Sequence, residues 1–157
     1  DHALHHMMDV DAALAWSVAS LRPGGVLLVN DYVGPTRLQW TRTEVDRARA
    51  FLAAHADALG VRPGSLRYST PLGRLRQMVR DPSEAPQSDR IEAAFERRCG
   101  GAMRPVGGAM IHLCASHVLA VSGADDDHPL LGELVRADLA ALEAGLYHFA
   151  AAGWVKP

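Results

Sequence analysis

Three histidines lie close together in the segment "HALHHMMD", which spans positions 2–9. An imidazole changes its charge near neutral pH, so His5 and His6 are candidates for a general base. The same side chain binds zinc and iron, which makes His2, His5 and His6 candidates for metal ligands. Neither the H-E-x-x-H nor the H-x-H spacing occurs here, so we expect no metal. In a third interpretation, the histidines end a strand and are solvated in a loop.

Composition and charge exclude several classes of protein. The 157 residues are 48% hydrophobic and 22% charged, as in globular proteins with a buried core. The formal net charge is −2 and no long basic run occurs, which predicts no nucleic-acid partner. No apolar run reaches the ~18–20 residues of a membrane span, so we also expect no membrane partner.

The cysteines and the N-terminal residues predict the cellular compartment of the protein. Cys99 and Cys114 form no C-x-x-C pair, which excludes a zinc ribbon, and two ordinary thiols suit a reducing cytoplasm. No signal peptide is visible, so the sequence predicts a cytoplasmic protein. The first residue is Asp1 rather than Met. We therefore expect the chain to be the C-terminal part of a longer protein or a gene fragment.

The first forty residues predict a helix followed by a strand. Asp9 is a helix N-cap residue, and apolar residues with helical spacing follow over 10–21. The "RPGG" turn at 22–25 ends that helix. The run "GVLLVND" at 25–31 is almost wholly apolar, which is typical of a strand covered on both faces in a parallel sheet. Gly34 and Pro35 then place 32–40 in a loop.

Helices dominate the middle of the chain. The "TRTE" sequence predicts a capping box, in which Thr41 and Glu44 begin a helix that is broken at 60–65. A second helix is expected over 72–79. The "DPSE" sequence at 81–84 predicts a short helix restart, and Ser88 is the expected N-cap of a helix that ends near residue 98.

The last third of the chain alternates strands and helices. We expect strands over 102–106 and 147–155 and a helix over 131–142. The apolar run at 111–121 fits a helix or a strand, and we prefer the helix. The resulting order is loop, helix, strand, helices, strand, helix and strand. That order is typical of the second half of an α/β domain rather than a complete one.

Two loops of this predicted fold belong to one site. In an open α/β sheet, ligands bind beyond the carboxyl ends of the strands. The "HALHH" loop and the "DYVGP" loop at 31–35 both occupy that position. His5, His6, Asp31 and Tyr32 should therefore be neighbours at one ligand site.

The joined stretch "HALHHMMDVDAALAWSVASLRPGGVLLVNDYVGPTRLQW" strongly resembles part of the class I S-adenosylmethionine-dependent methyltransferases. The L-R-P-G-G turn is a moderately specific signal, and its combination with Y-V-G-P-T-R-L-Q-W is much more specific. The later segments "DPSEAPQSDRIEAAF", "GGAMIHL" and "LVRADLAALEAGLYHFAAAGWVKP" also look like a bacterial subgroup associated with glycan or secondary metabolism. The resemblance covers essentially all 157 residues and implies the C-terminal half of a Rossmann-like α/β methyltransferase fold.

This resemblance implies S-adenosylmethionine as the cofactor and methyl transfer as the reaction. Ala3, Leu4 and His5 would line the methionine side of the cofactor, and His5 and His6 would lie near the methyl donor. One of the two would accept a proton from a hydroxyl or an amine, although in-line methyl transfer mainly needs alignment. The family's glycine-rich loop and ribose-binding acid are absent, so we expect the chain alone to bind the cofactor weakly or not at all.

The acceptor side is implied by the same resemblance. The acceptor would be a small molecule or a glycan-type natural product, and the methylated atom (O, N or C) is left open. Residues 41–98 would form a helical lid or insert over it. The candidate acceptor contacts are Asp31, Tyr32, Arg37, Gln39, Trp40 and His112. We prefer a structural clamp under the next helix for Arg37, Gln39 and Trp40, and a satisfied core position for His112.

Two other functions compete with methyl transfer. An incomplete domain could be inactive or act as an interaction module, and its sheet would expose an edge that favours self-association. A metal-dependent enzyme that uses His2, His5 and His6 would instead carry stoichiometric zinc or iron.

Overall fold

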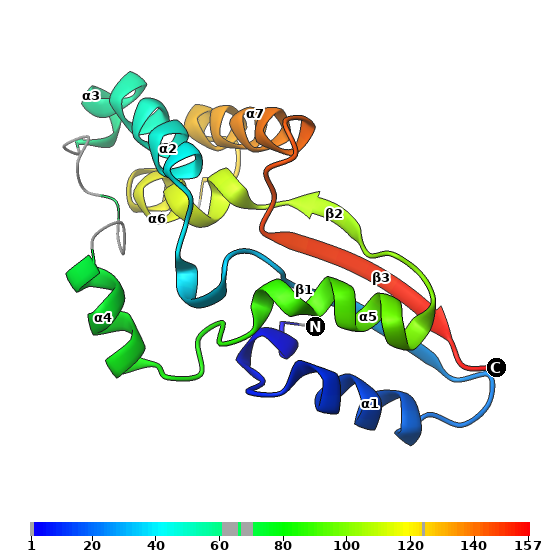
Figure 1. Ribbon diagram of the computed structural model, residues 1–157. Helices are drawn as coiled ribbons and strands as arrows, with labels where there is room; N and C mark the ends of the chain where they lie inside the picture. Colours follow the sequence, from blue (N-terminus) through cyan, green and yellow to red (C-terminus); the bar gives the residue numbers. More distant parts are fainter. Residues whose placement is uncertain (1, 61–65, 67–70, 124) are drawn as a thin grey trace.

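The computed structural model describes residues 2–60, 66, 71–123 and 125–157. The strands in these ranges are β1 (Val26–Tyr32), β2 (Arg104–Gly107) and β3 (Phe149–Val155). The α-helices are α1 (Val10–Ser20), α2 (Arg42–Ala54), α3 (Ala56–Leu59), α4 (Pro71–Arg80), α5 (Ile91–Cys99), α6 (Ala109–Ser122) and α7 (Pro129–Glu143). Short 3-10 helices lie at Leu4–His6, Thr36–Leu38 and Ser88–Arg90. The protein is a mixed α/β structure with a small sheet (Figure 1).

β3 is the central strand of the sheet, between β1 and β2, and runs antiparallel to both. β1 and β2 are therefore parallel to each other. The predicted strand over 25–31 is confirmed, with Val26 opposite Val155 and Tyr32 opposite Phe149. Its expected burial on both faces is wrong, because Leu28 is 73% exposed. An apolar run favours a strand but does not specify how many of its faces other elements cover.

Helices α1 and α5 lie side by side against one face of the sheet (Figure 1). Val10 and Leu14 of α1 and Ile91 and Phe95 of α5 are buried there and pack with Val29 of β1. Burying a side chain of this size contributes roughly 1.5–3 kcal/mol, so this layer stabilises the position of β1.

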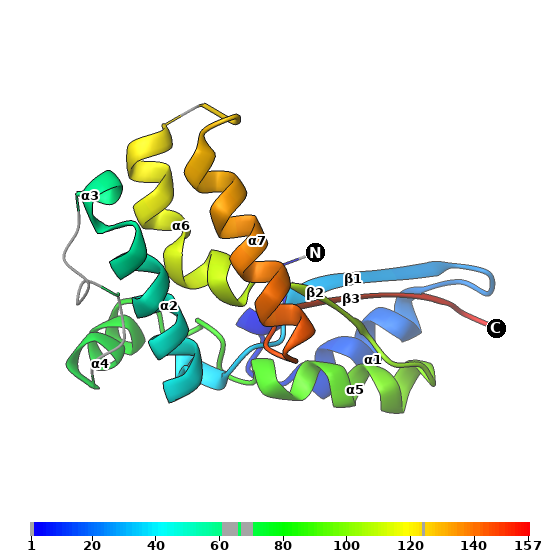
Figure 2. The ribbon, with the colours of Figure 1, turned by 90° about the horizontal axis from the view of Figure 1, so that it is seen from above.

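A second core joins α2, α6 and α7 beyond the carboxyl end of β1. Helices α6 and α7 pack against each other, and α2 packs against α6 (Figure 2). Leu52 of α2, Val118 of α6 and Ala141 of α7 are fully buried in this core. Tyr32, the last residue of β1, belongs to the same core. These helices therefore cover the end of the strand where the ligand site is predicted.

Several local sequence signals form as predicted. The Asp9 carboxylate accepts a hydrogen bond from the Ala12 backbone at the start of α1, and Thr41 and Glu44 make the capping box of α2. The helices predicted over 72–79, 111–121 and 131–142 are α4, α6 and α7, and the last two predicted strands are β2 and β3. The predicted break at 60–65 falls mostly outside the described residues.

Two predicted helix starts are wrong because their side chains make other hydrogen bonds. Residues 81–84 form a turn, in which the Asp81 carboxylate accepts from the backbone N–H and the hydroxyl of Ser83. Ser88 does not cap α5. Its buried hydroxyl donates to the Gly34 carbonyl at 2.8 Å, and α5 begins at Ile91.

A buried carboxylate of α7 fixes the start of α6. Asp138 accepts hydrogen bonds from the backbone N–H groups of Gly108, Met110 and Ile111 at 2.7, 2.8 and 3.1 Å. The first amides of a helix lack intrahelical partners and carry partial positive charge, so an acid there is stabilising. Gly108 has a φ of 89°, and a Cβ atom there would overlap Phe149. Glycine is therefore required where β2 leads into α6.

Candidate functional site

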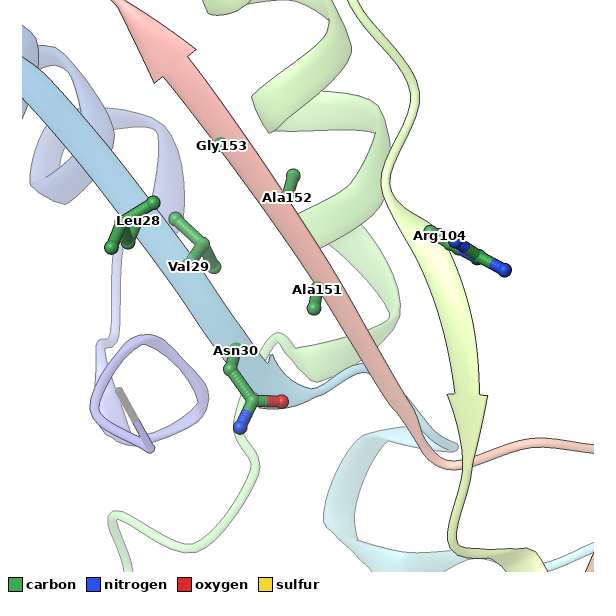
Figure 3. A pocket seen from close by; sticks show the side chains of 7 residues that line it. All are labelled: Leu28, Val29, Asn30, Arg104, Ala151, Ala152 and Gly153. Atoms are coloured by element: carbon green, nitrogen blue, oxygen red, sulfur yellow. The ribbon is translucent and has the colours of Figure 1, made fainter.

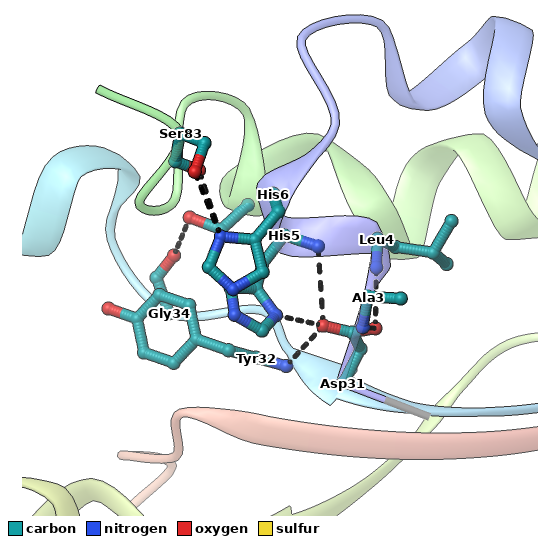
Figure 4. A network of polar contacts seen from close by, with 9 residues as sticks. Ala3, Leu4, His5, His6, Asp31, Tyr32, Gly34 and Ser83 are labelled. Carbon is teal, nitrogen blue, oxygen red and sulfur yellow. Dashed lines mark hydrogen bonds and ion pairs between the residues drawn. The ribbon is translucent and has the colours of Figure 1, made fainter. Parts of the chain in front are cut away.

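The buried carboxylate of Asp31 organises the N-terminal loop at the end of β1 (Figure 4). Its Oδ2 atom accepts hydrogen bonds from the backbone N–H groups of Ala3 and Leu4, both at 2.9 Å. Its Oδ1 atom accepts from the backbone N–H groups of His5 and Tyr32 and from the His5 ring. Asp31 is 1% exposed, so these donors replace its water shell. The predicted proximity of the 2–6 loop and the end of β1 is thus confirmed.

The Asp31 carboxylate determines which ring nitrogen of His5 carries the proton. Burial alone would raise the pKa of Asp31, but hydrogen bonds from the His5 ring and the Leu4 and Ala3 amides outweigh burial and lower that pKa to about 2. Asp31 is therefore ionised at neutral pH and can only accept. The Nδ1 atom of His5, 2.5 Å from Oδ1 of Asp31, must donate, which leaves the lone pair of the neutral ring on Nε2. A carboxylate orients general-base histidines in this way.

His6 and the 81–84 turn form a wall beside His5. The ring centroids of His5 and His6 are 4.0 Å apart. The Nδ1 atom of His6 lies 3.2 Å from the carbonyl oxygen of Ser83 and 3.5 Å from its hydroxyl. Figure 4 shows both imidazoles between Ser83 and Asp31. No local sequence signal predicts the contact between His6 and Ser83, because the two residues are 77 positions apart.

Arg37, in the loop after β1, also contacts the 81–84 turn. Its guanidinium donates to the backbone carbonyls of Pro82 and Glu84. The preferred clamp role of Arg37 agrees with these bonds, although the clamped element is the turn rather than α2. Trp40 is buried in the second core, and Gln39 is exposed. For these three residues, direct contact with an acceptor stays a prediction.

Tyr32 lies at the centre of a cluster of rings next to His5. The ring centroids of His5, His112, His148 and Phe149 are 5.1–6.1 Å from that of Tyr32, in edge-to-face arrangements. Tyr32 is 2% exposed, and its hydroxyl donates to a backbone carbonyl of the following loop at 3.1 Å. Burial raises the pKa of Tyr32, so the phenol is protonated at neutral pH. The geometry gives Tyr32 a packing role, and contact with an acceptor stays a prediction.

A second histidine–carboxylate pair, which the sequence did not reveal, contacts Tyr32. The Nε2 atom of His148 lies 2.8 Å from Oε1 of Glu44, and both side chains are buried. Burial would raise the pKa of Glu44, but hydrogen bonds from His148 and Thr41 lower it to about 2. The carbonyl of His148 also accepts from two amides of the loop after β1. His148 therefore joins that loop to α2.

His112 packs from α6 against Tyr32, Trp40 and His148. Burial first, and then the charges of nearby histidines, lower the pKa of His112 to about 4, so its ring is neutral near pH 7. Within the described residues, the Nδ1 atoms of His112 and His148 are buried without a hydrogen-bond partner. The preferred satisfied core position is therefore wrong for the Nδ1 atom of His112. A water molecule or a polar group of a ligand would find partners here.

The segment expected to line the cofactor uses its backbone groups within the protein. Its three amides donate to Asp31, and the carbonyls of Ala3 and Leu4 accept from the backbone N–H groups of His6 and Met7. These backbone groups are thus used within the protein, and the contact of Ala3, Leu4 and His5 with S-adenosylmethionine stays a prediction.

The described residues form no candidate metal site, and comparisons with known proteins identify no family for the chain. Among residues 2–60, 66, 71–123 and 125–157, no group of three or more His, Cys, Asp or Glu side chains is arranged to hold a metal ion. In the same ranges, no helix has the length and apolar character needed to cross a membrane. No family model, curated protein or solved structure matches the chain significantly. Function must therefore be inferred from the site itself.

Proposed function

We propose that the chain forms the acceptor side of an S-adenosylmethionine-dependent methyltransferase, which acts in its full-length parent on a small molecule or a glycan-type natural product. The observation that carries this proposal is the His5–Asp31 pair at the carboxyl end of β1. The sequence resemblance over essentially the whole chain supports it. The isolated chain is expected to be inactive, because the glycine-rich loop and the ribose-binding acid that the resemblance implies for the cofactor are absent from these 157 residues.

The sheet is compatible with part of a Rossmann-like fold. β1 and β2 run parallel, as strands of a doubly wound sheet do, and an antiparallel strand is a common addition to such sheets. On the outer edge of β1, the Asn30 carbonyl accepts a hydrogen bond from the backbone N–H of His2 at 2.9 Å. Further strands of a doubly wound sheet would pair along this edge. The three strands are then the C-terminal part of that sheet.

His5 is the general base in this proposal. Ionised Asp31 holds the Nδ1–H of His5, so Nε2 accepts the proton that a hydroxyl or amine acceptor loses as it is methylated. Asp31 then stabilises the imidazolium. When bound, S-adenosylmethionine supplies the electrophilic methyl group. His6 and the 81–84 turn shape the wall along which the acceptor reaches His5.

Groups around Tyr32 would orient the acceptor. The Nδ1 atom of His112, which has no hydrogen-bond partner among the described residues, offers a partner to a hydroxyl or amide of the acceptor. Helices α2 and α3 pack on α6, and α4 lies beside the Thr36–Leu38 turn, so this part of the predicted 41–98 lid is near the same end of β1. α5 packs instead beside α1 against the sheet. We therefore assign the lid role to α2, α3 and α4.

Calorimetric titration of S-adenosylhomocysteine tests the proposal. The ligand is titrated into the 157-residue chain and into a version extended upstream by the sequence that its gene encodes. Binding to the extended version alone supports the proposal. Absence of binding to both versions contradicts the cofactor assignment and returns the histidines to structural roles.

A further inference from the structure

The groups that can act together with His5 lie beyond the carboxyl end of β1 rather than on the face of the sheet. A hollow on that face is lined by residues 28–30 of β1, 151–153 of β3 and Arg104 of β2 (Figure 3). Among the described residues of this lining, Arg104 is the only ionisable one. Beyond the end of β1, in contrast, His148 and Glu44 form a buried histidine–carboxylate pair whose imidazole packs against Tyr32.

His148 joins three parts of the fold through its side chain and its backbone. Ionised Glu44 can only accept, so the Nε2 atom of His148 donates to Oε1 of Glu44 over 2.8 Å. The carbonyl of His148 accepts from the backbone N–H groups of Val33 and Gly34 at 2.7 and 3.2 Å. Its backbone N–H donates to the Gly107 carbonyl at 2.9 Å. His148 thereby ties α2 to the loop after β1 and to the end of β2.

The hydrogen bond to His148 is separate from the capping of α2. Within the capping box, Oε2 of Glu44 accepts from the backbone N–H and the hydroxyl of Thr41 at 2.6 and 2.7 Å. The other oxygen, Oε1, is the one that binds His148. Glu44 therefore has a second role besides beginning the helix, and a substitution at Thr41 can separate the two roles.

A buried pair of this kind is better explained by a fixed geometry than by a gain in stability. The exposed fractions of His148 and Glu44 are 0% and 5%, so both side chains have lost their water. The cost of removing such groups from water largely offsets their attraction, and apolar side chains of the same size are often as stabilising. The hydrogen bond, however, forms only when α2 and the loop after β1 hold one arrangement.

Tyr32 links this pair to His5 by two contacts. Its ring centroid is 5.6 Å from that of His148 and 6.1 Å from that of His5, edge to face in both cases. Its backbone N–H donates at 2.9 Å to Oδ1 of Asp31, the same oxygen that holds the Nδ1–H of His5. A shift of Tyr32 would therefore disturb both the ring packed beside His5 and the oxygen that orients His5.

We propose that Glu44 and His148 are positioning residues for the His5 base, which they hold in place through Tyr32. The inference rests on the proposed function, because it gives the pair a part in the work of His5. It also couples α2, one of the helices assigned to the lid, to the orientation of the base. A movement of α2 that breaks the bond between Glu44 and His148 would loosen the His5 ring.

Substitutions at Glu44 and Thr41 separate the pair from the helix cap. Glu44→Met removes the hydrogen bond to His148 and keeps a side chain of similar length. Glu44→Gln is the conservative variant, because its amide can still form a hydrogen bond with His148. Thr41→Ala is the matched control, because it removes the hydroxyl part of the capping box and leaves Oε1 of Glu44 bound to His148. Circular dichroism checks that each variant is folded.

Hydrogen exchange with solvent, followed by proton NMR, measures how firmly the site is held. The reporters are the Nδ1 proton of His5 and the backbone amide proton of Tyr32, because both groups donate to Asp31. The amide proton of Leu14, a fully buried residue of α1 in the other core, reports opening of the whole chain. Local opening raises exchange at the reporters alone, whereas global opening raises it at Leu14 as well.

In Glu44→Met, both reporters should exchange roughly tenfold or more faster than in Thr41→Ala, because losing a buried hydrogen bond loosens the site locally. The change at Leu14 should be much smaller. Glu44→Gln should lie between the two variants and, if Glu44→Met is not folded, must still exceed Thr41→Ala. Equal reporter rates in the Glu44 variants and Thr41→Ala overturn the proposal, as does a rise at Leu14 that matches the rise at the reporters.

The wild type separates this inference from the proposed function. A neutral His5 ring with its proton on Nε2 contradicts the proposed base, and the positioning role with it. A proton on Nδ1, together with equal exchange in the Glu44 variants and Thr41→Ala, contradicts the positioning role alone.

Discussion

Replacing Asp31 with asparagine removes the charge that organises the N-terminal loop and keeps the shape of the side chain. The carboxylate accepts from the amides of Ala3 and Leu4 on Oδ2, and from His5 and Tyr32 on Oδ1. An asparagine has one acceptor oxygen, so its NH₂ group must face donors on one side. The orientation that keeps the Oδ1 contacts loses the two bonds on Oδ2.

The expected loss of stability follows from those two bonds. Hydrogen bonds to a charged group contribute about 1.5–3 kcal/mol each. Ala3 is exposed, so water replaces part of what its amide loses. Two such bonds contribute about 3–6 kcal/mol, and we expect Asp31→Asn to lower the free energy of unfolding by about 3 kcal/mol, at the lower end of this sum. The ring of His5 also loses the anion that fixes its tautomer.

Urea unfolding followed by circular dichroism measures this difference. Asp46→Asn is the control, because Asp46 is an exposed residue of α2 whose ion pairs with Arg42 and Arg49 span 3.5 and 3.6 Å. Exposed pairs of this kind contribute about 0.2–1 kcal/mol, so the control should change stability little. If Asp31→Asn costs no more than Asp46→Asn, the Asp31 network does not hold the loop as described.

Three further changes test other parts of the structure. Asp138→Asn should lower the free energy of unfolding by about 2 kcal/mol in urea titrations, because the carboxylate satisfies three amides at the start of α6. The pKa values of Asp31 and Glu44 are lowered to about 2 in the folded chain, so the unfolded chain binds more protons in acid. Stability should therefore fall as the pH is lowered from about 4.5 to 2, and Glu44→Gln should flatten this acid limb in urea titrations at several pH values. Gly108→Ala should reduce the melting temperature more than Gly100→Ala, because both glycines have positive φ but only at Gly108 does a Cβ atom meet another side chain.

Local hydrogen-bonding signals made much of the fold predictable. The Asp9 cap and the Thr41–Glu44 box need only residues within one helical turn, and both form. Helix α7 follows from the apolar spacing within its segment, whereas the apolar run of α6 is also compatible with a strand. Each of these features depends on neighbours in the sequence, which is why the sequence was sufficient.

The wrong predictions arise where a distant group competes for the same side chain. Ser88 has the residue type of a helix cap, but the Gly34 carbonyl, 54 positions away, accepts its hydroxyl. Leu28 has the residue type of a buried strand, yet no described element covers its face. Neither outcome is encoded within a short window of sequence.

The candidate site was predictable only in part for the same reason. The meeting of His5 and Asp31 follows from a general property of sheets, that loops at the carboxyl ends of strands are neighbours. His148 and Glu44 are 104 positions apart, and no comparable property of sheets or helices predicts that they meet. Asp138 likewise reaches α6 from the middle of α7, where helical spacing predicts only another turn of helix.

The tautomer of His5 tests the proposed base most directly. Two-dimensional ¹H–¹⁵N correlation spectra of histidine-labelled protein at neutral pH report which ring nitrogen is protonated, and His5→Gln assigns the signal. At a pH at which the ring is neutral, we predict a single tautomer with the proton on Nδ1 and the lone pair on Nε2, because ionised Asp31 can only accept. A proton on Nε2, or a rapidly exchanging mixture of the two tautomers, would contradict the assignment of His5 as an Asp31-oriented general base.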